Sequence, residues 1–353
     1  MKPAGVSKDG SYESRLATAG MMGILGVSMA CRLGLEGGTM KPDTYETTLA
    51  EVRVVPSPGG YYAYPTWWDG WIVVQYEPKT DMTSVFTSRL WRLRADGSEF
   101  EMIQLPNHPA CGEDGVNGFG TSTALPDGRL GYDVLCRPED DLFGERSHLM
   151  AYDGASGEVE QVLNYPVPSR SVGTGGYAWN PDMTRMIMGD GHRYIDEQLY
   201  SFTRDGSDPL DVGLPLAYGP SWSPDGTQIA FIGSRSTGTP LIGSALGVYL
   251  MKADGTDVRL LLEGFYDSAG LAFSPDGRWV AFPGRFGRRE GEEQGLCLAD
   301  VETGERRLVA EGGFGVPKWS PDGQRILVVR WTGPPEDRED RLVIVEVGPV
   351  LED

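Results

Sequence analysis

The sequence predicts an all-β fold of six repeated four-stranded units, on the evidence of one phrase, its spacing and a turn-rich composition. An aromatic residue followed by Ser-Pro-Asp-Gly occurs at Trp222–Gly226, Phe273–Gly277 and Trp319–Gly323, with looser copies at Trp179–Met183, Ala124–Gly128 and Trp67–Gly70. The Asp residues of the six copies are 58, 55, 43, 51 and 46 residues apart, which suits propeller blades of about 40–50 residues. The 49 Gly and 25 Pro residues accompany a hydrophobic content of 40%, which fits a turn-rich β protein better than disorder.

The fourth unit shows how strands and turns alternate. In the Pro-Asp-Gly turn, Pro presets the backbone, Asp forms local hydrogen bonds and Gly adopts positive φ. One strand precedes this turn and Gln228–Ile232 follows it, while Val248–Met251 and Val258–Leu262 flank a second turn at Ala253–Gly255. Short strands bounded by Gly, Pro and Asp at regular intervals indicate an all-β protein. Four antiparallel strands per unit make each unit a propeller blade.

The two ends of the repeat region are predicted to close the ring together. The sixth unit takes its third strand from Leu342–Val347, and few residues follow before Asp353. An unassigned strand, Thr48–Val55, precedes the first unit. Because an open sheet edge invites aggregation, we expect this N-terminal strand to join the last blade.

The phrase, the hydrophobic strand after it and a later strand ending in Ala-Asp-Gly resemble the TolB-type propeller repeat, a WD-like repeat of bacterial envelope proteins. The resemblance covers residues 48–348 and is specific in units four to six, fair in unit three and weak in the first two. It implies a six-bladed β-propeller with a binding role at the cell envelope. The chain has no room for the N-terminal α/β domain of TolB, so a stand-alone propeller is expected. The same repeat occurs in propellers of prolyl-oligopeptidase-like hydrolases and in oligogalacturonate lyases.

The charge balance limits the classes of partner. The chain has 31 basic and 51 acidic residues, a net charge of −20. Nucleic acid and anionic membrane surfaces both require clustered Lys and Arg, so neither is an expected partner. The charge either serves solubility or attracts cationic ligands or Ca²⁺. No Walker A motif, dinucleotide fingerprint or EF-hand loop occurs, so no cofactor is predicted.

The N-terminus is interpreted as a targeting segment. Lys2, Lys8 and Arg15 precede an apolar stretch at 16–30, which is too short to span a bilayer and typical of a signal peptide. Ser28-Met29-Ala30 is a small-x-small cleavage site, and Cys31 after it suggests lipidation. The alternative is a disordered, mildly apolar tail. We therefore divide the chain into a signal-like segment (1–30), a flexible tether (31–47) and the propeller (48–353).

The other cysteines have different environments. Cys111 lies in the loop that enters the second blade and Cys136 ends that blade's second strand, so an exported chain could join them in a disulfide. Cys297 lies between Leu296 and Leu298 on a predicted strand and is expected to be a buried thiol.

Ligands are expected at the central channel, on the face opposite the Pro-Asp-Gly turns, where loops converge on a rigid scaffold. The loops that enter the blades carry aromatic residues at comparable places, namely Tyr61, Tyr177, Tyr218, Tyr266 and Phe314. A ring of aromatics could stack on a sugar or hold a peptide; alternatively, these side chains seal the gaps between blades. Arg285 and His192, in other loops of the same face, complete the set of ligand-face candidates.

The sequence assigns no catalytic residue and leaves the metal content of the channel open. Arg285 begins a cluster of basic residues. Its Arg side chains either pair with the Glu residues that follow or bind a carboxylate group of a ligand. His108 and His192 are expected to be exposed loop residues, with a base or metal ligand as the alternative. The Trp67–Trp71 cluster is interpreted as core, against a carbohydrate-stacking alternative. Gly120–Ala124 is the nearest string to a nucleophile elbow, but a turn and a strand follow it rather than a helix.

The sequence thus predicts an exported, monomeric, non-catalytic binding module for a protein or peptide at the cell envelope, in the periplasm or at the cell surface. Carbohydrate is an alternative ligand, and the membrane is reached only through a lipid anchor. The alternative function is a polysaccharide-active lyase or hydrolase with its site at the central channel. Clustered groups of shifted pKa at the channel mouth would favour the enzyme, and an exposed recognition patch would favour the binder.

Overall fold

The computed structural model describes residues 46–47, 49–78, 89–106, 108–109, 116–137, 146–163, 167–168, 177–189, 199–205, 210–211, 216–234, 246–265, 270–285, 294–333 and 338–351. These residues belong to a compact unit, Tyr45–Asp353. The unit Met1–Thr44, with the signal-like segment and Cys31, lies outside the described residues.

Blades 1 to 3 occupy the first half of this unit. Blade 1 consists of β3 (Gly60–Trp68), β4 (Trp71–Pro78), β5 (Arg89–Leu93) and β6 (Glu101–Met102). Blade 2 consists of β7 (Val116–Ala124), β8 (Leu130–Arg137), β9 (Arg146–Tyr152) and β10 (Val159–Gln161), with β11 (Val167–Pro168) also paired to β9. Blade 3 consists of β12 (Tyr177–Trp179), β13 (Arg185–Gly189), β14 (Leu199–Thr203) and β15 (Leu210–Asp211).

Blades 4 to 6 follow the same antiparallel order. Blade 4 consists of β16 (Leu216–Trp222), β17 (Gln228–Ser234), β18 (Leu246–Lys252) and β19 (Arg259–Phe265). Blade 5 consists of β20 (Ala272–Phe273), β21 (Trp279–Arg285), β22 (Gln294–Asp300) and β23 (Arg306–Glu311). Blade 6 begins with β24 (Gly313–Phe314) and β25 (Lys318–Trp319), which both pair with β26 (Arg325–Thr332), and continues with β27 (Glu339–Glu346). A short helix, α2 (Gly348–Leu351), follows.

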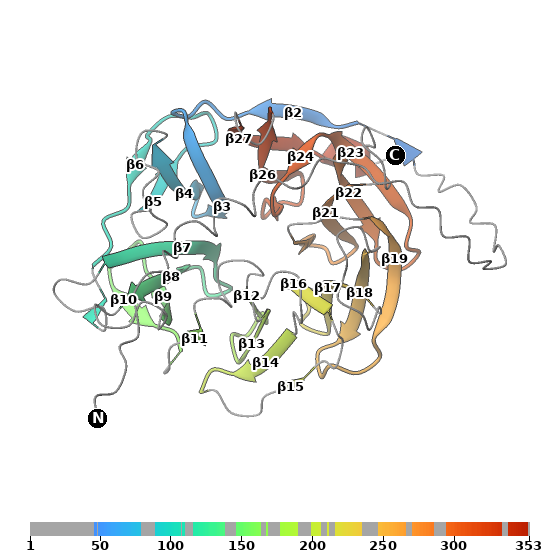
Figure 1. Cartoon of the computed structure of the whole chain (residues 1–353), viewed down its shortest axis with the longest axis horizontal. Coiled ribbons are helices and arrows are strands. Elements are labelled where there is room, and N and C mark those ends of the chain that lie inside the picture. The colour runs from blue at the N-terminus through green and yellow to red at the C-terminus, as the bar shows by residue number, and fades with distance from the viewer. Residues whose placement is uncertain are drawn as a thin grey trace, which may run out of the picture. The chain divides into compact units, whose positions relative to one another are not determined.

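The ring is closed by the N-terminal strand, as the sequence predicted. Strand β2 (Glu51–Val54) pairs antiparallel with β27, with Glu51 opposite Glu346 and Val54 opposite Val343. Before it, β1 (Glu46–Thr47) pairs in parallel with β23 of blade 5. The predicted all-β propeller of six four-stranded blades is therefore confirmed, with the first strand of a blade such as β16 toward the centre and the fourth, β19, at the periphery (Figure 1).

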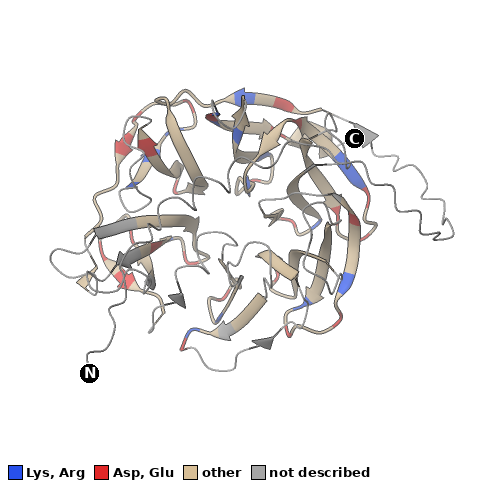
Figure 2. Ribbon diagram, viewed as in Figure 1, with Lys and Arg blue, Asp and Glu red and all other residues tan. Residues whose placement is uncertain are grey.

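Hydrophobic clusters fill the seams between neighbouring blades. Blades 4 and 5 share a cluster that includes Ile232, Val248 and Phe282, and corresponding clusters lie in the other seams among the described residues. Full burial of such a side chain contributes about 1.5–3 kcal/mol. Charged residues lie mainly on the outer strands and turns, whereas the strands toward the centre carry few (Figure 2). The core is therefore divided among the seams, and each blade depends on its neighbours.

The Trp-Ser-Pro-Asp-Gly phrase forms hydrogen bonds both within its own turn and to the preceding blade. In blade 4, Ser223 Oγ donates to Asp225 Oδ1 (2.6 Å) and accepts from Gln228 N (2.9 Å), which satisfies groups inside the hairpin. The Trp222 indole Nε1 donates to Ala178 O of blade 3 (3.1 Å). The equivalent bonds join Trp319 to Ala272 O and Trp67 to Lys318 O. The phrase is thus a structural signature of the ring.

Candidate functional site

The predicted ligand-face residues divide into buried, half-buried and undescribed positions. Tyr177 and Phe314 are buried and belong to the clusters between blades 2 and 3 and between blades 5 and 6. Tyr61 and Tyr218 are half-buried on β3 and β16. His192, Tyr266, Cys31 and Cys111 lie outside the described residues, and only the backbone of Arg285 and Cys136 is described. Among the described candidates, Tyr61 and Tyr218 are therefore the two whose side chains are partly exposed.

Two sequence interpretations can be compared directly with the structure. The expectation that His108 is exposed is wrong, because His108 is buried and its ring stacks on that of His148, also buried, with centroids 4.1 Å apart. The stack lies between the end of blade 1 and β9 of blade 2, where packing excludes water from both rings. The core interpretation of the Trp cluster is confirmed for Trp68 and Trp71, and Cys297 is buried as predicted.

Asp133 is the most strongly perturbed carboxyl group in the described part of the chain. It lies on β8, is 1% exposed and faces a bulge in β7 at Gly120, where an added Cβ would lie 2.3 Å from Asp133 Oδ2. Burial raises its pKa to about 7, against hydrogen bonds from Thr121 that favour the ionised form. Tyr177 of blade 3 interacts with Asp133 electrostatically, and burial raises the pKa of that phenol well above its usual value. This acid–tyrosine pair lies inside the wall of the ring.

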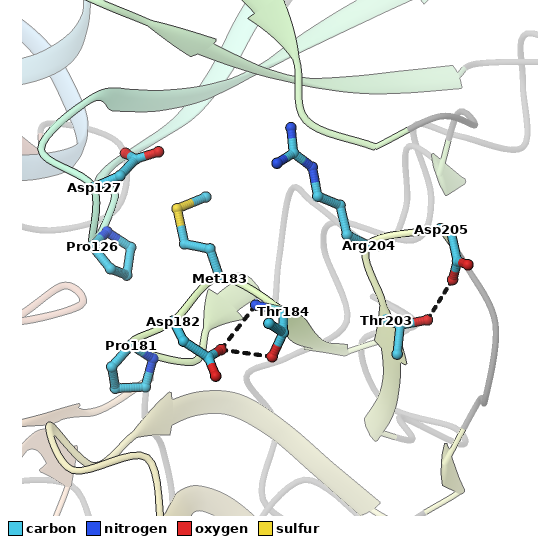
Figure 3. Close-up of a pocket in the computed structure, with 9 residues that line it drawn as sticks. All are labelled: Pro126, Asp127, Pro181, Asp182, Met183, Thr184, Thr203, Arg204 and Asp205. Carbon is cyan, nitrogen blue, oxygen red and sulfur yellow. Dashed lines mark hydrogen bonds between the residues drawn. The ribbon is translucent and has the colours of Figure 1, made fainter.

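An open cleft of about 670 Å³ lies on the face of the propeller that carries the Pro-Asp-Gly turns, at the seam between blades 2 and 3. We call it the turn-face cleft. Its lining comes from the turn of blade 2 and from both turns of blade 3, as Pro126, Asp127, Pro181, Asp182, Met183, Thr184, Thr203, Arg204 and Asp205 (Figure 3). Its volume lies within the usual range of about 300–1,000 Å³ for ligand pockets.

Two carboxyl groups of the cleft, Asp127 and Asp182, are held in the ionised form. Hydrogen bonds from the hydroxyl (2.6 Å) and amide (3.0 Å) of Thr184 lower the pKa of Asp182. Burial opposes ionisation of Asp127, but its bonds with Arg129 outweigh that effect and lower its pKa. Glu160 bridges Arg129 and Arg204, with both contacts at 2.7 Å. The cleft is therefore bordered by ionised side chains.

Met183 is the residue of this cleft that sequence reasoning missed. It stands in the third copy of the phrase, where a left-handed Gly completes the turn elsewhere, and it adopts φ of 56°. The signal for it in the sequence is the Met at the position where the other copies of the phrase have Gly.

No helix in the described ranges is long and apolar enough to cross a membrane. Within the same ranges, no three His, Cys, Asp or Glu side chains are grouped so that they could hold a metal ion.

Comparison with known proteins gives short or distant matches. No protein-family model matches the chain. A 125-residue stretch is 34% identical to the uncharacterized peptidase YuxL of Bacillus subtilis, and it represents 35% of this chain but 18% of that protein. The putative TolB of Agrobacterium tumefaciens matches with a TM-score of 0.52 and 18% identity, over 81% of this chain and 90% of that one. An oligogalacturonate lyase solved with manganese matches with a TM-score of 0.53 and 17% identity, over 84% of this chain and 79% of that one.

In fold, the chain is a TolB-like six-bladed β-propeller. Identities of 15–18% to the solved structures carry the fold alone. Because one fold hosts unrelated functions, any function has to be argued from the sites described above.

Proposed function

We propose that this chain is an exported, non-catalytic β-propeller that binds a protein or peptide partner at the cell envelope. The observation that carries the proposal is the turn-face cleft, an accessible hollow that combines apolar side chains with ionised carboxylates. In contrast, the acid whose pKa lies near neutrality, Asp133, is 1% exposed. The cleft is open to solvent, whereas packing leaves Asp133 almost no exposed surface.

The location outside the cytoplasm rests on the N-terminal sequence and on the TolB-like fold. The basic residues, the apolar stretch at 16–30 and Cys31 are the parts of a signal with a lipid anchor. The half-buried Tyr61 and Tyr218, together with His192, Tyr266 and Arg285, remain proposed contacts on the loop face, whereas Tyr177 and Phe314 would contribute there only by supporting it.

The test is affinity capture from envelope extract with the full chain, combined with mass spectrometry of its mature N-terminus. We expect processing before or at Cys31 and a recovered partner that, once purified, binds the chain one to one with a Kd in the micromolar range or below, which is about −8 kcal/mol. Cytosolic recovery with Met1 intact would contradict export. Failure of every recovered protein to bind after purification would contradict the binding role.

The second candidate is a polysaccharide-active lyase or hydrolase with its site at the central channel. Its supporting observation is Asp133, whose pKa of about 7 suits a general acid or base, although the side chain is 1% exposed and would need an opening toward the channel; the fold is also like that of an oligogalacturonate lyase. The test is an assay for new reducing ends and unsaturated products from oligogalacturonate and other acidic oligosaccharides. Turnover that Asp133→Asn abolishes in a folded variant would support this candidate over the binding module.

A further inference from the structure

The turn of blade 3 departs from the repeat at the Gly position, which is Met183. The equivalent turn position in the other five blades is a left-handed Gly, at Gly70, Gly128, Gly226, Gly277 and Gly323, with φ between 70° and 87°. Met183 adopts φ of 56°, which is unfavourable for a residue with a side chain. The chain therefore holds a side chain where its own repeat provides a relaxed Gly.

That side chain changes the seam between blades 2 and 3. In the following seams, a Cβ added at Gly226 would lie 3.1 Å from Pro181 of the preceding blade, and one at Gly277 would lie 3.3 Å from Pro224. At these two positions glycine thus permits close approach of successive turns, whereas a Cβ added at Gly128 would meet nothing within 4 Å. In blade 3, Met183 occupies this place and packs against the hydrophobic cluster between blades 2 and 3. Its side chain extends into the turn-face cleft between Asp127 and Arg204 (Figure 3).

The charges in the cleft favour a cation. Asp127, Asp182 and Asp205 line it together with Arg204. Arg129 already pairs with Asp127 at 2.7 Å, and Glu160 bridges Arg129 and Arg204, so these four acids and two Arg residues leave a net charge of −2. Arg204 is already engaged, since Nη2 lies 2.7 Å from Glu160 Oε1 and Nε donates to Val162 O at 3.0 Å. Asp182 uses one oxygen for both bonds to Thr184, and an ionised carboxylate has acceptor sites beyond those. The cleft therefore offers carboxylate oxygens above a floor of Met and Pro.

We propose that the turn-face cleft binds an extended peptide segment bearing Arg or Lys, whose aliphatic stem lies on Met183, Pro126 and Pro181 and whose cationic head pairs with the carboxylates. This inference rests on the proposed binding function and names the chemistry of the partner. Arg and Lys match the site because each combines an apolar stem with a charged head. The flexible Met thioether adapts to such stems.

The test is fluorescence polarisation with the full chain and two labelled, capped hexapeptides, one alternating Leu and Arg and the other alternating Leu and Glu. We expect the Arg peptide to bind with a Kd of about 100 μM or tighter at low salt and more weakly as salt rises, and the Glu peptide not to bind. Met183→Gly should weaken binding about fivefold through loss of the apolar floor. Asp182→Asn should weaken it about two- to fivefold, as for an exposed ion pair.

Asp254→Asn is the matched control, because the whole chain is acidic and could attract a cationic peptide anywhere. Asp254 Oδ1 accepts from the amide (2.9 Å) and hydroxyl (2.6 Å) of Thr256, as Asp182 does from Thr184, but it lies in the β18–β19 turn. Unchanged binding by Asp254→Asn, with loss in the two cleft variants, would support the site. Equal loss in Asp254→Asn, or full binding by Met183→Gly, would overturn it. If an identified envelope partner still binds wild type while the Arg peptide does not, the cleft inference fails and the proposed function stands.

Discussion

Two kinds of seam in this ring differ at one position of the same turn. The seams on either side of blade 4 have Gly there, whereas the seam between blades 2 and 3 has Met183. Around blade 4, Gly226 and Gly277 lie close to the Pro of the preceding turn. Between blades 2 and 3, Met183 replaces the Gly and a cleft of about 670 Å³ remains. The same seam holds the buried Asp133. The seam between blades 2 and 3 thus combines a departure from the repeat, at Met183, with a buried acid.

The largest effect is expected from the core of a regular seam. Phe282 is fully buried between blades 4 and 5, so Phe282→Ala should lower the free energy of unfolding by about 3–5 kcal/mol. Leu149→Ala, between blades 2 and 3, should cost about 2–3 kcal/mol, because the open seam can partly collapse around the cavity. Chemical denaturation measures both, with the exposed Met102→Ala as control. Equal losses in the two seams would contradict this difference.

Asp133 should make the irregular seam sensitive to pH. Its pKa is raised to about 7 in the fold, against an ordinary value of 3.8, so the folded protein holds a proton that the unfolded chain has lost. The corresponding stability is present below about pH 4 and is lost as pH rises to about 7, by on the order of 3 kcal/mol.

Asp133→Asn should remove that loss, so the variant should be more stable than wild type at pH 8. Thermal unfolding from pH 5 to pH 8 measures both proteins, and Asp254→Asn provides an exposed acid as control. A wild-type stability that is constant over this range would show that the carboxyl is ionised in the fold.

A smaller loss of stability is expected when the hydrogen bond from the Trp of the phrase to the preceding blade is removed. Trp319→Phe keeps an aromatic ring but removes the Nε1 bond to Ala272 O. Leaving that carbonyl without its donor should cost about 1–3 kcal/mol. Trp222→Phe, which removes the equivalent bond to Ala178 O, should cost a similar amount by chemical denaturation. If neither variant loses stability, the ring depends on packing of the indoles and not on their hydrogen bonds.

Blades 4 to 6 could be predicted from sequence because the residues that form their turns lie close together in the chain. Ser, Pro, Asp and Gly each satisfy a need of the turn within a few residues, and Thr48–Val55 was assigned to the last blade because a ring cannot keep an open edge. The bonds of Ser223, Ser274 and Ser320 to the Asp two residues later follow the same pattern in three blades.

The buried Asp133, the buried His108 and the turn-face cleft, all in blades 1 to 3, could not be predicted in the same way, because they depend on contacts between distant residues. Nothing in the sequence around Asp133 distinguishes it from other strand residues, because its burial comes from the β7 bulge and from blade 3. His108 was expected to be exposed, and it is His148, 40 residues later, that buries it. The cleft is formed by three turns together, and it lies on the face opposite the loops that were predicted to bind a ligand.

The smallest effect is expected from exchanging the residues that distinguish the two kinds of seam. Gly226→Met should destabilise the protein by about 1–2 kcal/mol, because its Cβ would lie 3.1 Å from Pro181 and φ is 70°. Met183→Gly should change stability by less than about 1 kcal/mol, because relief of the left-handed backbone offsets the lost contact with the seam cluster. Paired thermal melts of the two variants measure this asymmetry. Equal destabilisation by both would mean that Met183 is needed to close its seam, which would remove the reason for interpreting the cleft as functional.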